Sequence, residues 1–152
     1  MLQLLAAVEI LETYGVRSEI YSATSYGELR REGLECERIN RLNPSKERKI
    51  PYIEELLGGG EYPTIAVSDN QIAVPDMIRQ WVGGEYTVLG TDGFGRSDTR
   101  QNLRKFFEID AQSITIAALS SLVRSGEIEN DIFDKALISL NINKTREDIT
   151  SL

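Results

Sequence analysis

Hydrophobic residues recur three or four positions apart in several segments of the chain, and this spacing predicts helices. Leu4, Val8 and Leu11 form one such stripe within residues 2–14. Ser25 and Glu28 have the spacing of a capping box, which predicts a helix running towards residue 41. Further helices are predicted over residues 51–57, 75–82, 110–126 and 131–140. Another helix is predicted to follow a capping box at residues 98–101.

Three segments have the composition of β-strands. Residues 63–68 are short and apolar, as in strands that are buried on both faces, and residues 86–89 are similar. Residues 16–24 are rich in β-formers and are also expected to form a strand. Because strands alternate with helices, the sequence predicts a single α/β domain with a mostly parallel sheet covered on both faces.

The glycine-rich run over residues 90–100 lies between a predicted strand and a predicted helix. This arrangement can direct backbone N–H groups at an anion or a neighbouring subunit. The run begins as G-x-G at Gly93, but Asp98 stands where a dinucleotide-binding loop needs its last glycine. The preferred interpretation is a tight turn with Asp98 as the helix cap. The alternative is that Arg96, Ser97 and Arg100 face a substrate channel or a partner subunit.

Few side chains in the sequence could perform chemistry. The chain contains no histidine and one cysteine, which excludes histidine-assisted nucleophiles and thiolate zinc sites. Cys36 lies between Glu35 and Glu37, so we expect a raised thiol pKa and a packing role. Tyr21 and Tyr26 either line a site at the end of a strand or serve in the core. Independent catalysis is not expected.

The net charge of −7 disfavours nucleic acid as a partner, and the basic residues do not gather into a stripe along the sequence. No apolar run approaches the roughly 20 residues that span a bilayer, so no membrane partner is expected. The N-terminus lacks the positive region of a signal peptide, and a single cysteine fits a reducing compartment. These features predict a cytoplasmic protein.

The run Val88-Leu89-Gly90-Thr91-Asp92-Gly93-Phe94-Gly95-Arg96-Ser97-Asp98-Thr99-Arg100, together with several shorter motifs, resembles one family. The resemblance is to the C-terminal domain of the homodimeric bacterial pyruvate dehydrogenases, which are thiamine-dependent decarboxylating enzymes. The resemblance covers roughly residues 2–140, and its most specific part is the run at residues 88–100. The other matching segments are residues 20–26, 28–29, 36–38, 51–53, 102–104 and 125–128, with Asn40, Leu42 and Pro44.

The resemblance implies a transketolase C-terminal fold: an α/β/α sandwich around a mostly parallel five-stranded sheet. It also implies that the domain's first strand is missing here, in agreement with a first helix that begins without a capping residue. Residues 1–140 would form this domain and residues 141–152 a polar tail. In such enzymes thiamine diphosphate and Mg²⁺ are bound by upstream domains, so no cofactor, metal or catalytic residue is assigned to this chain.

The resemblance further implies that the domain supports a homodimer and borders the active-site entrance, within an enzyme that passes its acetyl group to a lipoyl acyltransferase. The residues expected in this supporting loop are Asp92, Phe94, Arg96, Ser97 and Arg100. The family pattern has tryptophan at the position of Ile39 and histidine at that of Asn43, and no counterpart of residues 58–60. These departures leave other 2-oxo acids open as substrates.

Two other functions fit the sequence. The chain could be a stand-alone partner-binding or regulatory α/β module without enzymatic activity. It could also be a small nucleotide-binding protein that uses the glycine-rich run.

Overall fold

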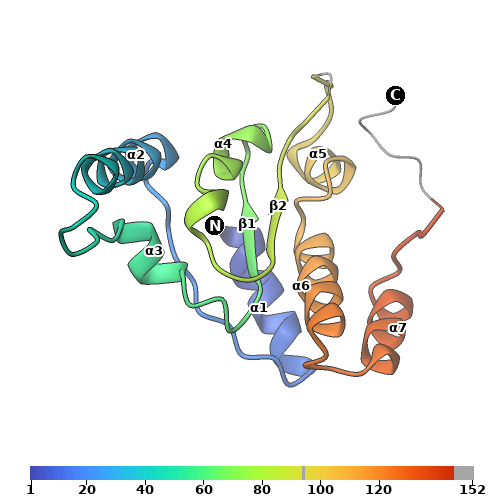
Figure 1. Cartoon of the computed structure of the whole chain (residues 1–152). Coiled ribbons are helices and arrows are strands. Elements are labelled where there is room, and N and C mark those ends of the chain that lie inside the picture. Colours follow the sequence, from blue (N-terminus) through green and yellow to red (C-terminus); the bar gives the residue numbers. More distant parts are fainter. Residues whose placement is uncertain (94, 146–152) are drawn as a thin grey trace.

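The computed structural model describes residues 1–93 and 95–145 (Figure 1). These residues form seven α-helices, one 3₁₀ helix and two strands. In chain order the elements are α1 (Leu2–Thr13), α2 (Tyr26–Leu42), α3 (Tyr52–Leu57), β1 (Thr64–Val67), α4 (Ala73–Asp76), η1 (Arg79–Trp81), β2 (Tyr86–Leu89), α5 (Arg100–Phe106), α6 (Ala111–Ser125) and α7 (Asn130–Ser139).

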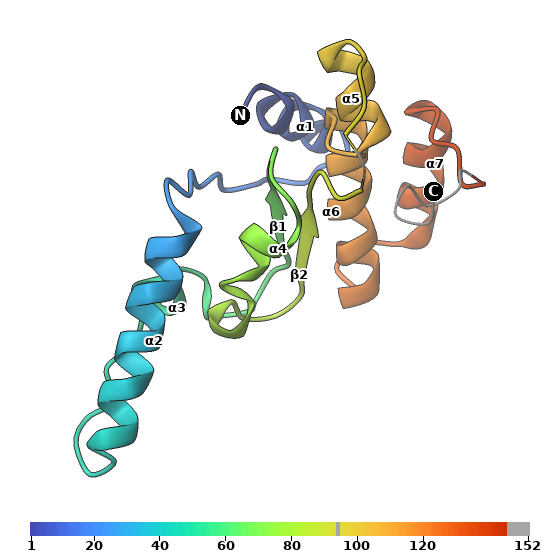
Figure 2. The same ribbon diagram turned by 90° about the horizontal axis from the view of Figure 1, so that it is seen from above.

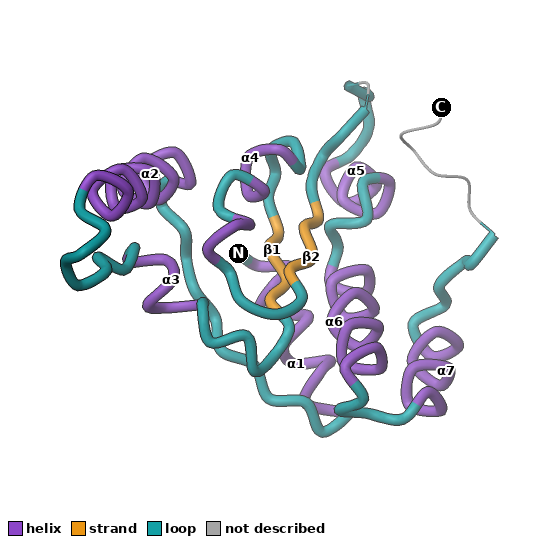
Figure 3. The backbone as a smooth tube through the Cα atoms, in the orientation of Figure 1, coloured by secondary structure: helices purple, strands orange, loops and turns teal. Residues whose placement is uncertain are grey.

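The two strands form a parallel pair at the centre of the molecule (Figure 3). Thr64 lies opposite Tyr86, and Val67 lies opposite Leu89. Parallel strands require a crossover connection, which α4 and η1 provide here. The α/β class predicted from the sequence is therefore confirmed, with two strands in the described residues where the family resemblance implied five.

Helices cover both faces of this strand pair (Figure 2). Ala66 and Tyr86 pack on one face in a cluster with Ile53, Ile78 and Trp81, which α2 and α3 help to cover. On the other face, Val67 and Leu89 contact a cluster formed by α1 and α6. A third cluster joins α1, α6 and α7. Successive residues of one strand point to opposite faces, so each strand contributes to both layers.

The strand expected over residues 16–24 is not formed. Residues 17–25 are exposed and have no regular structure. In the described part of the chain β1 pairs with β2 alone, so this segment has no neighbouring strand with which to exchange backbone hydrogen bonds. A segment with high strand propensity forms a strand only where it has a strand partner and a surface to pack on. The prediction from composition was wrong because residues 16–24 have no such strand partner.

The helix expected over residues 75–82 is divided. Residues 75–76 belong to α4 and residues 79–81 to the 3₁₀ helix η1, and Met77 between them is 39% exposed. The hydroxyl of Tyr86 donates a hydrogen bond to the Pro75 carbonyl at 2.9 Å. The tighter 3₁₀ turn brings residues three apart onto one side, so that Ile78 and Trp81 are both buried.

Two glycine segments approach each other between α3 and β2. A Cβ atom added to Gly60 would lie 2.6 Å from the Gly84 nitrogen, and both residues have positive φ angles, +67° and +66°. Only glycine allows such backbone contact in this conformation. The turn at residues 58–60 is therefore packed against residues 83–84.

One segment, Arg100–Ser125, is long and apolar enough to cross a membrane by length and composition. The fold divides it into α5 and α6, and Glu108 between them has a φ of 56°. Ile114 and Leu119 of α6 are buried against α1 and α7. This packing is typical of a core helix in a globular domain.

A glycine on α2 provides a test of this packing. In a Gly33→Ala variant the new Cβ would lie 2.5 Å from the Trp81 ring, which is itself buried. We expect the free energy of unfolding to fall by about 1–3 kcal/mol. Gly27→Ala on the same helix is the control: its Cβ meets nothing closer than 3.9 Å, and its stability should stay the same or rise by up to about 1 kcal/mol. Urea denaturation of both variants measures their free energies of unfolding. Equal stability of Gly33→Ala and Gly27→Ala would contradict the contact between Gly33 and the Trp81 ring.

Candidate functional site

The glycine-rich loop begins at the carboxyl end of β2 and is held there by the segment that follows β1. Asp92 Oδ1 accepts a hydrogen bond of 2.7 Å from the Ile72 N–H. Thr91 donates its N–H to the Asn70 carbonyl at 3.0 Å and its hydroxyl to the Asp69 carbonyl at 3.0 Å. The first part of the loop is thus fixed to its neighbour, and the Asp92 carboxylate has a structural partner.

The second part of the loop leads into α5. Thr99 caps this helix, accepting a hydrogen bond of 3.3 Å from the Asn102 N–H. Asp98, predicted as the cap, instead accepts from the Thr99 N–H and from the Asn102 side chain, both at 2.7 Å. These hydrogen bonds lower the pKa of the Asp98 carboxyl. The prediction was wrong by one residue because Asp98 and Thr99 are both good capping residues.

The five residues predicted as a functional loop are only partly brought together. Arg96 and Arg100 line a large hollow of about 1790 Å³ between α1, α5 and α6, whereas Asp92 and Ser97 are not part of its lining. The Arg96 guanidinium lies over the Phe106 ring, 4.8 Å from its centroid. Phe94 lies outside the described residues.

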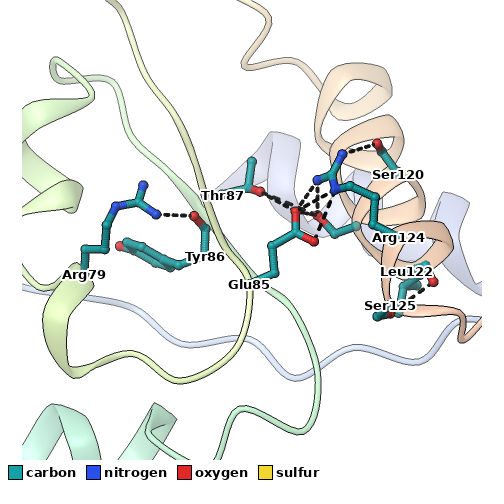
Figure 4. Close-up of polar contacts among 9 residues, drawn as sticks. Arg79, Glu85, Tyr86, Thr87, Ser120, Leu122, Arg124 and Ser125 are labelled. Carbon is teal, nitrogen blue, oxygen red and sulfur yellow. Dashed lines mark hydrogen bonds and ion pairs between the residues drawn. The ribbon is translucent and has the colours of Figure 1, made fainter.

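A polar network that the sequence did not reveal joins β2 to α6 (Figure 4). Glu85 forms an ion pair with Arg124 and accepts a hydrogen bond of 2.9 Å from the buried Ser121 hydroxyl. Thr87 donates to the same carboxylate at 3.4 Å. The Arg124 hydrogen bond is the main cause of the lowered pKa of Glu85. The sequence feature that could have indicated this network is the presence of two polar residues, Ser121 and Arg124, on one face of an otherwise apolar helix.

A second anchor lies on the other face of β2. Arg79 donates a hydrogen bond of 2.8 Å to the Tyr86 carbonyl (Figure 4). Its guanidinium also lies 5.1 Å from the centre of the Tyr86 ring and pairs with Asp76. Burial, as the main cause, raises the pKa of the Tyr86 hydroxyl far above its usual value. Tyr86 is therefore a neutral structural residue at physiological pH.

Cys36 is a buried packing residue, as predicted. Burial is the first cause of its raised thiol pKa, and the hydrogen bond from its Sγ to Glu32 at 3.1 Å is the second. The prediction had assigned this effect to Glu35 and Glu37. Glu35 makes only a small contribution, and Glu37 accepts a hydrogen bond of 3.1 Å from the Trp81 indole.

The remaining candidate side chains make local packing or hydrogen-bond contacts. Tyr26 packs beside the core cluster, and Ser25 caps α2. Tyr21 is exposed, and its hydrogen bond to Glu19 is the main cause of its raised pKa. Asn43, at the family's histidine position, donates to the Ile39 carbonyl at 2.9 Å.

The arrangement provides a concave surface with arginine side chains on its lining. Within residues 1–93 and 95–145 no cluster of three or more cysteine, aspartate or glutamate side chains could hold a metal ion. Arg104, which sequence reasoning did not single out, lines the same hollow as Arg96 and Arg100. The sequence feature that could have indicated Arg104 is the regular spacing of four residues between Arg96, Arg100 and Arg104.

The Asp92 contact can be tested by amide exchange. In an Asp92→Ala variant the Ile72 N–H loses its acceptor, so we expect it to exchange at least about tenfold faster. An Asp92→Asn variant keeps an acceptor oxygen and should retain protection. NMR exchange rates give the answer, with the Thr91 amide as an internal reference. Unchanged Ile72 protection in the alanine variant would show that this bond does not hold the loop.

The Glu85 network predicts a pH dependence of stability. A carboxylate whose pKa is lowered by folding stabilises the native state above its unfolded value of 4.5, and this effect is lost as the pH falls through the folded value. We expect Glu85→Gln to be less stable than the wild type by about 1 kcal/mol at pH 7, since exposed Arg124 is screened by solvent, and equally stable near pH 3.

Urea denaturation across this pH range measures the difference. Asp131→Asn, which breaks an exposed ion pair with Lys135, is the control and should change stability little. A Glu85→Gln effect that stays constant from pH 7 to pH 3 would show that the charge of Glu85 contributes nothing.

Comparison with known proteins shows which family has this domain. Residues 1–110 match the family model described as "Transketolase-like TK C-terminal domain". The chain is 43% identical over 144 residues to the pyruvate dehydrogenase E1 component of Pseudomonas aeruginosa, which covers 94% of the chain and 16% of that protein. The Escherichia coli K12 E1 component is 43% identical over 139 residues, or 90% of the chain and 15% of that protein.

The E1 component of Corynebacterium glutamicum is 46% identical over 133 residues, which is 87% of the chain and 14% of that protein. The chain thus spans about 15% of the length of these curated relatives. The family match covers more than two thirds of the chain and includes both strands and the glycine-rich loop. The chain belongs to the transketolase-like C-terminal domain family.

Proposed function

We propose that this chain acts as the C-terminal domain of a thiamine diphosphate-dependent pyruvate dehydrogenase. The observation that carries the proposal is the identity of 43% to pyruvate dehydrogenase E1 components over about nine tenths of the chain. The parent enzyme would decarboxylate pyruvate oxidatively and transfer the acetyl group to lipoamide. Residues 1–140 would be the domain and residues 141–152 its polar tail.

The residues that the structure describes do not offer a set of ligands for the cofactor's metal. The Asp92 carboxylate already accepts the Ile72 N–H, and the described residues contain no cluster of metal-ligating side chains. Thiamine diphosphate and Mg²⁺ would therefore be bound by other parts of the parent enzyme. Its cofactor would perform the carbanion chemistry, and the isolated chain would be inactive.

The glycine-rich loop would support the active-site entrance or a subunit contact, through Asp92, Phe94, Arg96, Ser97 and Arg100. Support for this role comes from the way the loop is held. Bonds to residues 69–72 fix its first part, while Arg96 and Arg100 remain exposed at the hollow. A rigid base with exposed cations suits contact with another part of the enzyme.

The partners would be the remainder of the parent polypeptide, a second copy in a homodimer, and a lipoyl acyltransferase that receives the acetyl group. Nucleic acid and membranes are not expected partners. The chain and its parent would act in the cytoplasm.

The loop's role is tested in the full-length parent enzyme. Arg96→Ala removes a cation that lies over the Phe106 ring, and we expect lower kcat or a weaker dimer, by about tenfold. Arg38→Ala, an exposed change on α2, is the control and should alter neither property. Steady-state kinetics and sedimentation would measure both. Unchanged turnover and unchanged sedimentation of the Arg96→Ala enzyme would contradict the supporting role.

A further inference from the structure

Asp92 and Gly93 form an Asp-Gly pair within the glycine-rich loop. No other aspartate or asparagine in the sequence precedes a glycine. Gly93 is exposed and has a φ angle of 102°, whereas Asp92 is half-buried. The Gly93 N–H donates to no other residue that the structure describes. The carboxyl group of Asp92 is therefore followed directly by an exposed peptide nitrogen.

An aspartate in this position can react with the peptide bond that follows it. The Gly93 nitrogen attacks Cγ of Asp92 and closes a five-membered succinimide ring. The hydroxyl of the protonated carboxyl group leaves as water and takes the proton of the nitrogen with it. Because glycine has no Cβ atom, it does not hinder the approach to its own nitrogen. The step changes no oxidation state, and water is its only by-product.

Water then opens the succinimide ring at one of its two carbonyl groups. Addition at Cγ breaks the bond between Cγ and the Gly93 nitrogen and restores aspartate. Addition at the main-chain carbonyl of Asp92 breaks the bond between that carbonyl and the same nitrogen, which leaves isoaspartate. In isoaspartate the main chain runs through Cβ and Cγ, so it is one carbon longer, and the carboxylate is attached directly to Cα.

Hydrogen bonds at the base of the loop oppose ring closure. Asp92 Oδ1 accepts the Ile72 N–H at 2.7 Å, which holds the carboxylate towards the segment after β1. Ring closure turns the Cα–Cβ bond away from the staggered positions in which side chains rest, so the carboxylate leaves Ile72. Thr91 adds two bonds of 3.0 Å to carbonyl groups of the same segment. The Asp-Gly pair therefore reacts when the base of the loop opens.

We propose that Asp92 is a site of isoaspartate formation, and that release of the loop base from residues 69–72 sets the rate. Open states are rare in a folded protein, so the folded chain reacts slowly at this position and the unfolded chain reacts faster. The reaction also changes the loop, because the displaced carboxylate no longer reaches the Ile72 N–H. This chemistry belongs to the chain's own residues and is independent of the proposed function.

The test follows isoaspartate in the purified chain and in the full-length parent, at neutral pH and physiological temperature. Peptide mass spectrometry with electron-transfer fragmentation distinguishes isoaspartate from aspartate at residue 92. We expect isoaspartate to accumulate first at Asp92, and at least about tenfold faster in guanidinium chloride than in the folded protein. An isoaspartyl methyltransferase with a labelled methyl donor counts the sites. Asp92→Glu, which would need a six-membered ring, should remove this labelling.

Two matched threonine variants test the role of the loop base. Thr91→Val removes the hydroxyl bond to the Asp69 carbonyl and keeps the Asp-Gly pair, so isoaspartate should form about three- to tenfold faster than in the wild type. Thr99→Val removes the α5 cap at the other end of the loop and should leave the rate within about twofold. Thermal unfolding of each variant establishes that it folds.

The reacted protein provides a second readout. In protein enriched in isoaspartate the Ile72 amide should exchange at least about tenfold faster, as in Asp92→Ala. Equal rates of isoaspartate formation in the folded and unfolded protein would show that the loop base gives no protection. Equal rates in Thr91→Val and Thr99→Val would place the controlling motion elsewhere. Isoaspartate at other aspartates before Asp92, or none at Asp92 in denaturant, would overturn the site itself.

Discussion

The pairing of β1 with β2 is the constraint on which the rest of this structure depends. The two strands share four residue pairs in parallel register, and each of their faces is covered by a separate hydrophobic cluster. Alternation along each strand directs Ala66 to one cluster and Val67 to the other. A shift of one residue in either strand would exchange these faces and expose apolar side chains, so burial fixes the register.

The register also places the candidate site. Parallel strands end at the same edge, which brings the segment after β1 beside the loop after β2. There the Asp92 carboxylate meets the Ile72 N–H, and a Cβ on Gly90 would lie 2.7 Å from the Asn70 carbonyl oxygen. The loop is thus held at its base by the sheet, while the residues further along project Arg96 and Arg100 towards the hollow. Rigidity at the base and charge at the rim follow from the same strand pairing.

Much of the fold was predictable because it depends on local signals. The spacing of Leu4, Val8 and Leu11 predicted α1, and the Ser25 cap predicted the start of α2. The strand expected at residues 16–24 does not form because a strand needs a neighbouring strand, which no local sequence pattern reveals.

The candidate site was predictable only in part, for the same reason. The loop was recognised from its glycines, but the Glu85–Arg124 ion pair joins residues 39 positions apart. The shared position of the three arginines became visible only once α5 was placed beside α6.

The central claim is that this chain functions as one domain of a much longer decarboxylating enzyme. Its family membership supports that claim, as does its similarity to about 15% of the length of each E1 component. Polar side chains such as Asp92 and Glu85 make structural contacts, which also agrees with a supporting domain. The most direct test is an immunoblot of the native polypeptide, with an antibody raised against this chain, in the cells that encode it. The account predicts a band several times heavier than 17.1 kDa, and a single band at 17.1 kDa would contradict it.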